Sequence, residues 1–323
     1  MFYSGMNRPT LFLHHFLKVK YLAPSCRLRT KNCIQGVMHM ARLFAAKGMP
    51  RQIAAFLLLL LISRVAQPAQ LKQQTVDEWN RYILATQAQI DKRVSGQTPF
   101  LWLDSMPDGS SRARNGEIVV APFEEPTPKH VSGGLVHHWI GAAFIPGAKM
   151  KDVLIVVRDY AQYKDFYAPS VIASALTTEK PPPIGEADRF VLRLRNQSLV
   201  SKAALDATYT ATYVQLDPKR TYAVAHTTRV QEIDHFGEAS QRTLPPGEGN
   251  GYIWQLYATT RFVEQDGGVY IEAEGIALSR DIPVAARWFV DPIVRRVSRD
   301  ALHTSLTQTV QAVNKYVASG KGR

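Results

Sequence analysis

Five consecutive segments rich in β-branched and aromatic residues fill most of the chain between residues 188 and 279. Short turn sequences separate some of them, including DPKR at 217–220 and DGG at 266–268. Strands of this length joined by such turns form antiparallel meanders. The sequence therefore predicts a large antiparallel sheet, built from DRFVLRLRNQSLV, ALDATYTATYVQL, TYAVAHTTRVQEID, GYIWQLYATTRFVEQ and GVYIEAEGIALS.

Segments on either side of this meander complete the predicted element order. GLVHHWIGAAFIPGAKM predicts a strand that Pro146 ends, and residues 150–168 carry apolar groups at helical spacing. Ser298 can cap a C-terminal helix, and Pro292 argues against one long straight helix that starts earlier. One face of this helix requires a large apolar partner, because it gathers Leu302, Leu306, Val310, Val313 and Val317.

Residues 70–130 precede these elements and have a different character. Thr75 and Glu78 have the spacing of a capping box, which predicts a helix that runs to about Arg93. Its apolar positions are Val76, Trp79, Ile83 and Ile90. The rest of the stretch is dense in turn residues around two short apolar pieces, FLWL and EIVV, and predicts an irregular arm.

Residues 1–69 have the character of a leader. The apolar run at 53–62 has the length of a signal-peptide core and is shorter than the roughly 20 residues of a membrane-spanning helix. Small residues follow it up to Ala66 or Ala69, where cleavage is expected. The sequence thus predicts export to the periplasm or the exterior, with an uncleaved, membrane-anchoring signal as the alternative.

Charge and cysteine use agree with this division. The net charge of +12 comes mainly from residues 1–69, which hold ten of the 39 Lys and Arg residues and no Asp or Glu. The remaining 29 basic residues nearly balance 27 acidic ones, so no nucleic-acid partner is expected. Both cysteines, Cys26 and Cys33, precede the apolar run, which excludes thiolate chemistry from the exported part.

The element order resembles the START-like, or SRPBCC, superfamily with its Bet v 1-like helix-grip fold. The resemblance is carried by GLVHHWIGAAFIPGAKMKDVLIVVRDYAQYKDFYAPSV, by GGVYIEAEGIALSRDIP and by the terminal helix. In particular the chain is similar to exported bacterial START-like proteins of unassigned activity. We therefore predict an α+β fold with an antiparallel sheet wrapped around the C-terminal helix and an N-terminal helical extension. The expected parts are a leader at 1–69, helix and arm at 70–130, a ligand-binding domain at 131–318 and a tail at 319–323.

The resemblance implies a cavity for a hydrophobic ligand, used by some family members for lipid or sterol carriage and by others for cyclase or aromatase chemistry. Residues 70–130 depart from the family pattern, because the basic helix-grip fold does not need them. Aromatic residues supply apolar area with a few polar handles, which suits such a ligand. The candidate ligand-binding residues are Tyr209, Tyr213, His226, Trp254, Tyr257, Glu274, Arg280 and Trp288.

A hairpin at Asp266 and Gly267 decides the role of two glutamates. With a two-residue turn, Arg261 lies opposite Glu272 and Thr259 opposite Glu274, and the carboxylates share a face with Arg261. Glu272 is then half of a solvent-side ion pair. In the alternative, a one-residue shift at the glycines turns Glu274 inward, where its carboxylate is a catalytic candidate.

The remaining polar candidates have structural interpretations beside functional ones. His137 and His138 point to opposite faces of a strand, so they cannot share a metal site, and no metal or cofactor is expected. His226 is predicted on one face with Val224, Thr228 and Val230, where it orients a ligand or is a structural histidine. In the same way His303 is placed near a cavity mouth. Asp281 is expected to cap a helix at Pro283, and Arg280 to meet a ligand head group or simply to flank that helix.

Three functions fit these patterns. The first is an exported binding or carrier protein for a lipid, a sterol-like or an isoprenoid compound, with possible peripheral membrane contact. The second is a cyclase or aromatase that uses Glu274, His226 or a cavity tyrosine as acid or base. In the third, the arm fills the groove and the protein is an interaction module. We expect a binding protein rather than an enzyme, because no P-loop, dinucleotide or nucleophile-elbow motif occurs.

Overall fold

The computed structural model describes residues 70–197, 202–282 and 284–320. Residues 70–282 and 290–320 form one compact unit, to which the description below refers. Its helices are α4 (Gln73–Val94), η3 (Trp102–Ser105), α5 (Gly109–Arg114), α6 (Met150–Val157), η4 (Tyr160–Gln162), α7 (Tyr163–Phe166) and, from residue 290 on, α8 (Val284–Ala318). Its strands are β1 (Val119–Pro122), β2 (Lys129–Val131), β3 (Gly134–Pro146), β4 (Val171–Leu176), β5 (Ala187–Gln197), β6 (Lys202–Asp217), β7 (Arg220–Asp234), β8 (Arg242–Thr243), β9 (Gln255–Gln265) and β10 (Gly268–Arg280).

The strands form one antiparallel sheet in the order β1-β3-β10-β9-β7-β6-β5-β4, with β2 paired to β3 and β8 to β7. Each of the five predicted meander segments forms a strand, β5 to β7, β9 and β10. The turns at 217–220 and 266–267 lie where the sequence placed them. The antiparallel meander is therefore confirmed.

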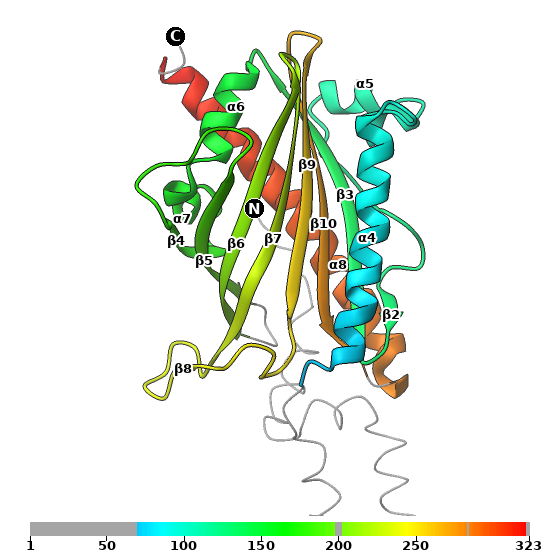
Figure 1. Ribbon diagram of the computed structural model, residues 1–323, viewed down its shortest axis with the longest axis vertical. Helices are drawn as coiled ribbons and strands as arrows, with labels where there is room; N and C mark the ends of the chain where they lie inside the picture. Colours follow the sequence, from blue (N-terminus) through cyan, green and yellow to red (C-terminus); the bar gives the residue numbers. More distant parts are fainter. Residues whose placement is uncertain (1–69, 198–201, 283, 321–323) are drawn as a thin grey trace, which may run out of the picture. The chain divides into compact units, whose positions relative to one another are not determined.

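Helices cover both faces of the sheet (Figure 1). We call the face that packs on α8 the inner face, and the face that packs on α4 the outer face. Successive side chains of a strand point to opposite faces. Phe262 and Ile271 therefore lie in the inner core, whereas Val263 and Tyr270 lie in an outer core. An antiparallel sheet with one long C-terminal helix against its inner face confirms the predicted α+β helix-grip class.

Helix α8 packs as predicted but begins earlier. Leu306 and Val313 are buried in the inner core, and Leu302, Val310 and Val317 pack beside them, so the predicted apolar face is confirmed. The expected start at Ser298 is wrong, because the helix already begins at Val284 and continues through Pro292. Pro292 is the ninth residue of this helix, so it lies in the helix interior, where it removes one main-chain N–H donor without ending the helix.

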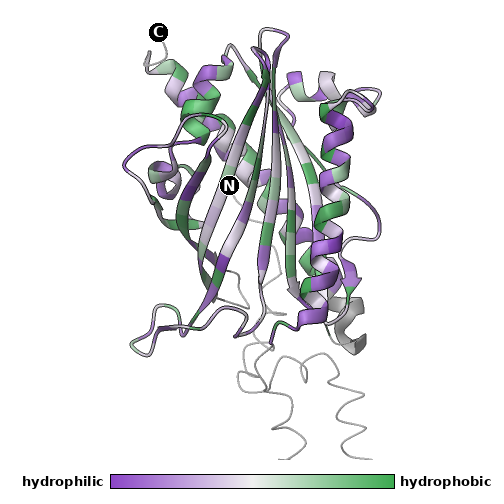
Figure 2. Cartoon of the chain, viewed as in Figure 1, coloured by the Kyte–Doolittle hydropathy of each residue, from purple (hydrophilic) through white to green (hydrophobic). Residues whose placement is uncertain are grey.

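Helix α4 lies on the outer face, in the foreground of Figure 1. Trp79 and Ile90 are buried against Trp254, Ile276 and Leu278 of the sheet side, and Figure 2 shows hydrophobic and hydrophilic turns alternating along the helix. The predicted helix is confirmed, whereas its capping box is wrong.

The capping-box side chains serve another contact. The helix begins after Lys72, one turn earlier than the box requires. The hydroxyl of Thr75 donates to the carbonyl of Ser132 at 2.5 Å, and the carboxylate of Glu78 accepts the backbone N–H of Ser132 at 3.0 Å and its hydroxyl. These contacts attach the first turns of α4 to the β2–β3 turn.

The arm between α4 and β3 is more regular than predicted. It contains η3, α5, β1 and β2, and Leu101 and Leu103 are buried on the outer face with Val119 of β1. Because these residues cover the outer face, the hypothesis that the arm fills the groove beneath α8 is wrong. From the arm, only Val120 of the edge strand β1 and Ile118 just before that strand reach the inner core.

The leader hypotheses fall on residues 1–69, which lie outside the described part of the chain. Within the described part, no helix combines the length and the apolar character needed to cross a bilayer.

Candidate functional site

An apolar layer lies between the inner face of the sheet and the helices α6 and α8. Its fully buried members include Val153, Phe262, Ile271 and Val313. Other members are only half-buried although they pack against this core, and they come from both the sheet and α8: Tyr209, Ala225, Ala273, Leu302 and Val310. Half-buried apolar surface inside a layer of this kind is what a hydrophobic ligand can cover.

Three tyrosine hydroxyls in this layer form hydrogen bonds with other described residues, and a fourth does not. Tyr160 donates to Asp188 at 2.7 Å, Tyr213 donates to the carbonyl of Val157 at 3.2 Å, and Tyr167 lies 2.9 Å from the hydroxyl of Thr309. Tyr209 stacks on Phe190 with 5.1 Å between ring centroids, and its hydroxyl bonds to no described residue. Burial raises the pKa of Tyr209, so this hydroxyl is neutral and available to a ligand.

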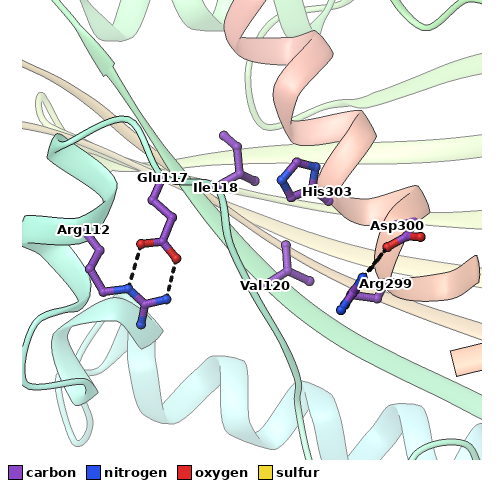
Figure 3. A pocket seen from close by; sticks show the side chains of 7 residues that line it. All are labelled: Arg112, Glu117, Ile118, Val120, Arg299, Asp300 and His303. Atoms are coloured by element: carbon purple, nitrogen blue, oxygen red, sulfur yellow. Dashed lines mark hydrogen bonds and ion pairs between the residues drawn. The ribbon is translucent and has the colours of Figure 1, made fainter. Parts of the chain in front are cut away.

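A pocket of about 340 Å³ opens at the edge of this layer, where α5, β1 and α8 meet. We call it the α8 pocket. Figure 3 shows Ile118 and Val120 between an Arg112–Glu117 pair on one side and side chains of α8 on the other. Both apolar residues also pack against the inner core, so the floor of the pocket is continuous with the apolar layer.

Charged and polar side chains form the rim of the α8 pocket: Arg112, Glu117, Arg299, Asp300 and His303. Arg112 holds Glu117 with two hydrogen bonds, of which Nε to Oε2 is 2.9 Å. The bond from Arg112 lowers the pKa of Glu117, which is therefore ionised and already paired. Arg299 contacts Asp300 at 2.9 Å. His303 therefore lies at a pocket mouth, as predicted, with its exposed imidazole at the rim.

A charge cluster lies on the outer face, beneath α4 and η3. Arg261 donates to Glu272 at 3.1 Å and to Glu274 at 3.0 Å from both terminal nitrogens, while His138 Nε2 lies 2.9 Å from Glu274. The backbone N–H of Trp102 donates to Glu272 at 2.6 Å. Arg261 is 1 % exposed and Glu272 0 %. The cluster is therefore enclosed between the sheet and the arm.

Burial and charge shift the two carboxyl groups in opposite directions. Burial raises the pKa of Glu272 to about 7, although the charges of Arg261 and Arg93 oppose it. Burial also acts to raise the pKa of Glu274, but the hydrogen bond from His138 and the charge of Arg261 outweigh it and lower the pKa. His137, on the inner face, has its pKa lowered to about 4 by burial, and its Nε2 lies 2.8 Å from the hydroxyl of Ser279.

This cluster corrects the solvent-side assignment of the glutamates. The register itself is confirmed, because Arg261 pairs with Glu272 and Thr259 with Glu274 without a shift at the glycines. The predicted solvent-side ion pair is wrong, because α4 and η3 cover that face. Glu274 is buried in the unshifted register, but against α4 rather than against α8. Its hypothesised place beside the C-terminal helix is thus also wrong.

The eight candidate ligand-binding residues do not form one site. Tyr209 and Tyr213 belong to the inner layer, whereas Trp254, Tyr257 and Glu274 are buried on the outer face. His226 and Arg280 are exposed, and Arg280 donates to the carbonyl of Asn250 at 3.2 Å. The side chain of Trp288 lies outside the described residues. Residues from both faces were grouped because the sequence shows the strands but not the second covering layer.

A bulge in β7 explains the misplaced histidine. Thr208 pairs with Arg229, but Tyr209 pairs with Thr227, so Thr228 is an extra residue. Val224 packs with the outer core and Val230 packs beside Tyr209, on the inner side. The prediction that His226 shares a face with both valines is therefore wrong.

The predicted role of Asp281 as the cap of a helix at Pro283 is only partly covered by the described residues. The carboxylate of Asp281 accepts the N–H of Ile282 at 2.8 Å and lies 3.4 Å from His130 Nδ1. Helix α8 starts at Val284. Whether Asp281 caps it stays a prediction, because the start of α8 has no described side chains.

Sequence reasoning missed the residues of the α8 pocket that come from the arm. Arg112, Glu117, Ile118 and Val120 were assigned to an irregular connection. The apolar piece EIVV was a usable signal, because a strand of this composition requires a partner strand, which is β3. Sequence reasoning also did not predict that Tyr82 and Arg261 belong to the buried hydrogen-bond network of His138, Glu274 and Glu272.

Comparisons with known proteins concern the fold alone. No family model matches the chain, and no curated protein does. Among solved structures, the chain is similar to the STAR-related lipid transfer protein from Xanthomonas axonopodis, at 17% identity, with 62% of this chain and 98% of that chain covered and a TM-score of 0.36. It is also similar to human STARD10, at 9% identity, 68% and 82% coverage and a TM-score of 0.38.

An enzyme is among the similar structures too. The Zhui aromatase/cyclase from Streptomyces sp. R1128 has 14% identity, with 56% of this chain and 96% of that chain covered and a TM-score of 0.34. Scores this low support no argument about this chain, whose fold class follows from its own strand order and helix placement.

Proposed function

We propose that this chain is an exported protein that binds a hydrophobic small molecule, such as a lipid, a sterol-like or an isoprenoid compound, between the inner face of the sheet and α8. The observation that carries the proposal is the α8 pocket, whose apolar floor of Ile118 and Val120 continues into the half-buried apolar layer. Covering that surface supplies affinity at roughly 25 cal/mol per Å².

The rim of the pocket suits a polar head group on such a ligand. Arg299 and His303 lie on α8 at the mouth, and the guanidinium N–H groups of Arg299 that do not contact Asp300 suit carboxylate or phosphate oxygens. Further along the layer, the unused hydroxyl of Tyr209 supplies one internal hydrogen-bonding group. A long amphipathic molecule with one anionic end matches this arrangement.

The cyclase alternative has less support from the structure. Its named acid or base candidates are Glu274, which is buried under α4, and His226, which is exposed on the outer side of β7. Neither lies in the layer where the hydrophobic molecule is placed. The hydroxyl of Tyr213 is already bonded to Val157.

Filling the α8 pocket should weaken ligand binding. We expect Val120→Trp to lower the amount of co-purified lipid, and the affinity for a fluorescent fatty acid, by roughly tenfold, because the indole occupies the floor of the pocket. Native mass spectrometry with organic extraction measures the first quantity and displacement titration the second. Val191→Trp is the matched control, since Val191 is an exposed valine of β5. Wild-type protein that carries no lipid, or a Val120→Trp variant that binds normally, would contradict the proposal.

Export is a separate part of the proposal and has its own test. Mass spectrometry of the protein from its own host should find a mature N-terminus just after Ala66 or Ala69, in the exported fraction. An intact chain in the membrane fraction would support the anchored alternative instead.

A further inference from the structure

A second pocket lies on the outer face, and it shares no lining residue with the α8 pocket. It has a volume of about 200 Å³ and is lined by Tyr82, Glu124, Glu125, Pro126, Thr127, Lys129, Val136 and His138. We call it the α4 pocket. Nothing in the proposed function uses it, since it lies on the other side of the sheet from the apolar layer.

The inner end of this pocket is held by the charge cluster. Tyr82 Oη lies 2.7 Å from His138 Nδ1, and His138 Nε2 lies 2.9 Å from Glu274. Phe123 stacks on the imidazole with 4.2 Å between ring centroids, and Arg261 fixes the far oxygen of Glu274. The ring of His138 therefore has one well-defined orientation, which in turn orients the hydroxyl of Tyr82.

The direction of the hydrogen bonds follows from the protonation of Glu274. The lowered pKa of Glu274 means that the carboxylate is ionised and only accepts, so His138 Nε2 must carry the hydrogen. Nδ1 of the same ring takes up one hydrogen-bonding position of Tyr82 Oη. The remaining lone pair of Tyr82 Oη can accept a hydrogen bond, so the pocket offers an acceptor.

The charges around the pocket favour a positively charged donor. Glu125 is paired with Arg295, and its other oxygen accepts the N–H of Thr127. Glu124 has no hydrogen bond or ion pair with any described residue, and its charge contributes to the pKa of Tyr82, which burial mainly raises to about 12. The unpaired carboxylate and the tyrosine thus face the same space.

The chain already places one of its own cations there. The ammonium of Lys129 lies 5.2 Å from the centroid of the Tyr82 ring, in the range of a cation–π contact. Lys129 is exposed and belongs to the short strand β2. An ammonium group thus already lies against the face of the tyrosine ring that lines the pocket.

We propose that the α4 pocket is a binding site for a small primary ammonium ion, in which Glu124 and Tyr82 Oη accept its N–H groups and the exposed Lys129 competes for the same position. His138 and Glu274 are positioning residues, because they act only by holding the hydroxyl of Tyr82. The site is independent of the hydrophobic ligand.

Calorimetric and saturation-transfer NMR titrations of the full chain with n-butylammonium test this site, with n-butanol and butyrate as probes of the same chain length. We expect saturable binding of n-butylammonium only. Lys129→Met should tighten it by roughly tenfold, because it removes a like charge at close range. Tyr82→Phe keeps the ring but loses the acceptor and should weaken binding by roughly tenfold.

Lys180→Met is the control, since Lys180 is an exposed lysine outside the pocket, and it should leave the affinity unchanged. Equal binding of n-butanol, absence of n-butylammonium binding to both wild type and Lys129→Met, or a weaker affinity in Lys129→Met would overturn the proposal. Lipid binding through the α8 pocket should be the same in all these variants. The proposals for the two pockets are therefore tested independently.

Discussion

Replacing Arg261 with methionine should lower the free energy of unfolding by about 3–5 kcal/mol, because it removes the buried counter-ion that Glu272 and Glu274 share. Methionine keeps most of the apolar volume, so packing loss contributes little to the effect. Urea unfolding followed by tryptophan fluorescence measures the change.

Arg193→Met is the matched control for this loss. Arg193 makes the same kind of two-bond contact with Asp206, at 2.7 and 2.9 Å, but the two side chains are 40 % and 32 % exposed. Such a pair contributes about 0–1 kcal/mol. The triple variant Arg261→Met, Glu272→Gln, Glu274→Gln should recover most of the stability, since no charge of the cluster's central ion pairs remains. Equal, small losses in Arg261→Met and Arg193→Met would show that the cluster is solvated.

Glu272→Gln should change how stability depends on pH. The pKa of Glu272 is raised from 4.5 to about 7 in the folded chain. The folded state therefore holds the proton more tightly, and the resulting stabilisation is fully present below pH 4.5 and is lost as the pH rises through 7. A difference of about 2.5 pKa units corresponds to about 3 kcal/mol. The unfolding free energy of Glu272→Gln minus that of wild type should therefore increase by up to this amount between pH 4.5 and 8.

Glu264→Gln provides a control of opposite sign. The N–H of Met150 and the ammonium of Lys149 lower the pKa of Glu264, so its stabilisation is present above its ordinary pKa and is lost as the pH falls. The difference between Glu264→Gln and wild type should stay constant above about pH 5. A flat profile for Glu272→Gln over the whole range would mean that Glu272 is already ionised in the folded protein at acid pH.

These effects have one structural origin, the layer that residues 70–130 form on the outer face. A sheet with a solvated outer face would tolerate Arg261, Glu272 and Glu274 as ordinary surface charges. Because α4 and η3 cover them, each group needs a partner in place of water. Glu272 has the charge of Arg261 and hydrogen bonds from the backbone N–H groups of Trp102 and Leu103. Residues 70–130 therefore bury these charges and also supply some of their hydrogen-bond partners.

The sequence alone determined the elements and their register. Alternation and turn residues placed β5 to β7, β9 and β10, and the Asp266–Gly267 turn placed Arg261 opposite Glu272. Helical spacing identified the faces of α4 and α8 that become buried. These features depend on residues close together in the chain, so local patterns are sufficient to predict them.

Only the tertiary structure decided which face of the sheet each helix covers. Helix α4 precedes the sheet by many residues, and no local pattern states that its apolar stripe packs over Ile276 and Leu278. For that reason the burial of Glu272, the division of the candidate ligand residues between two faces, and both pockets could not be predicted from the sequence. The physical reason is that burial and pKa depend on contacts between segments more than 100 residues apart, such as Trp102 and Glu272.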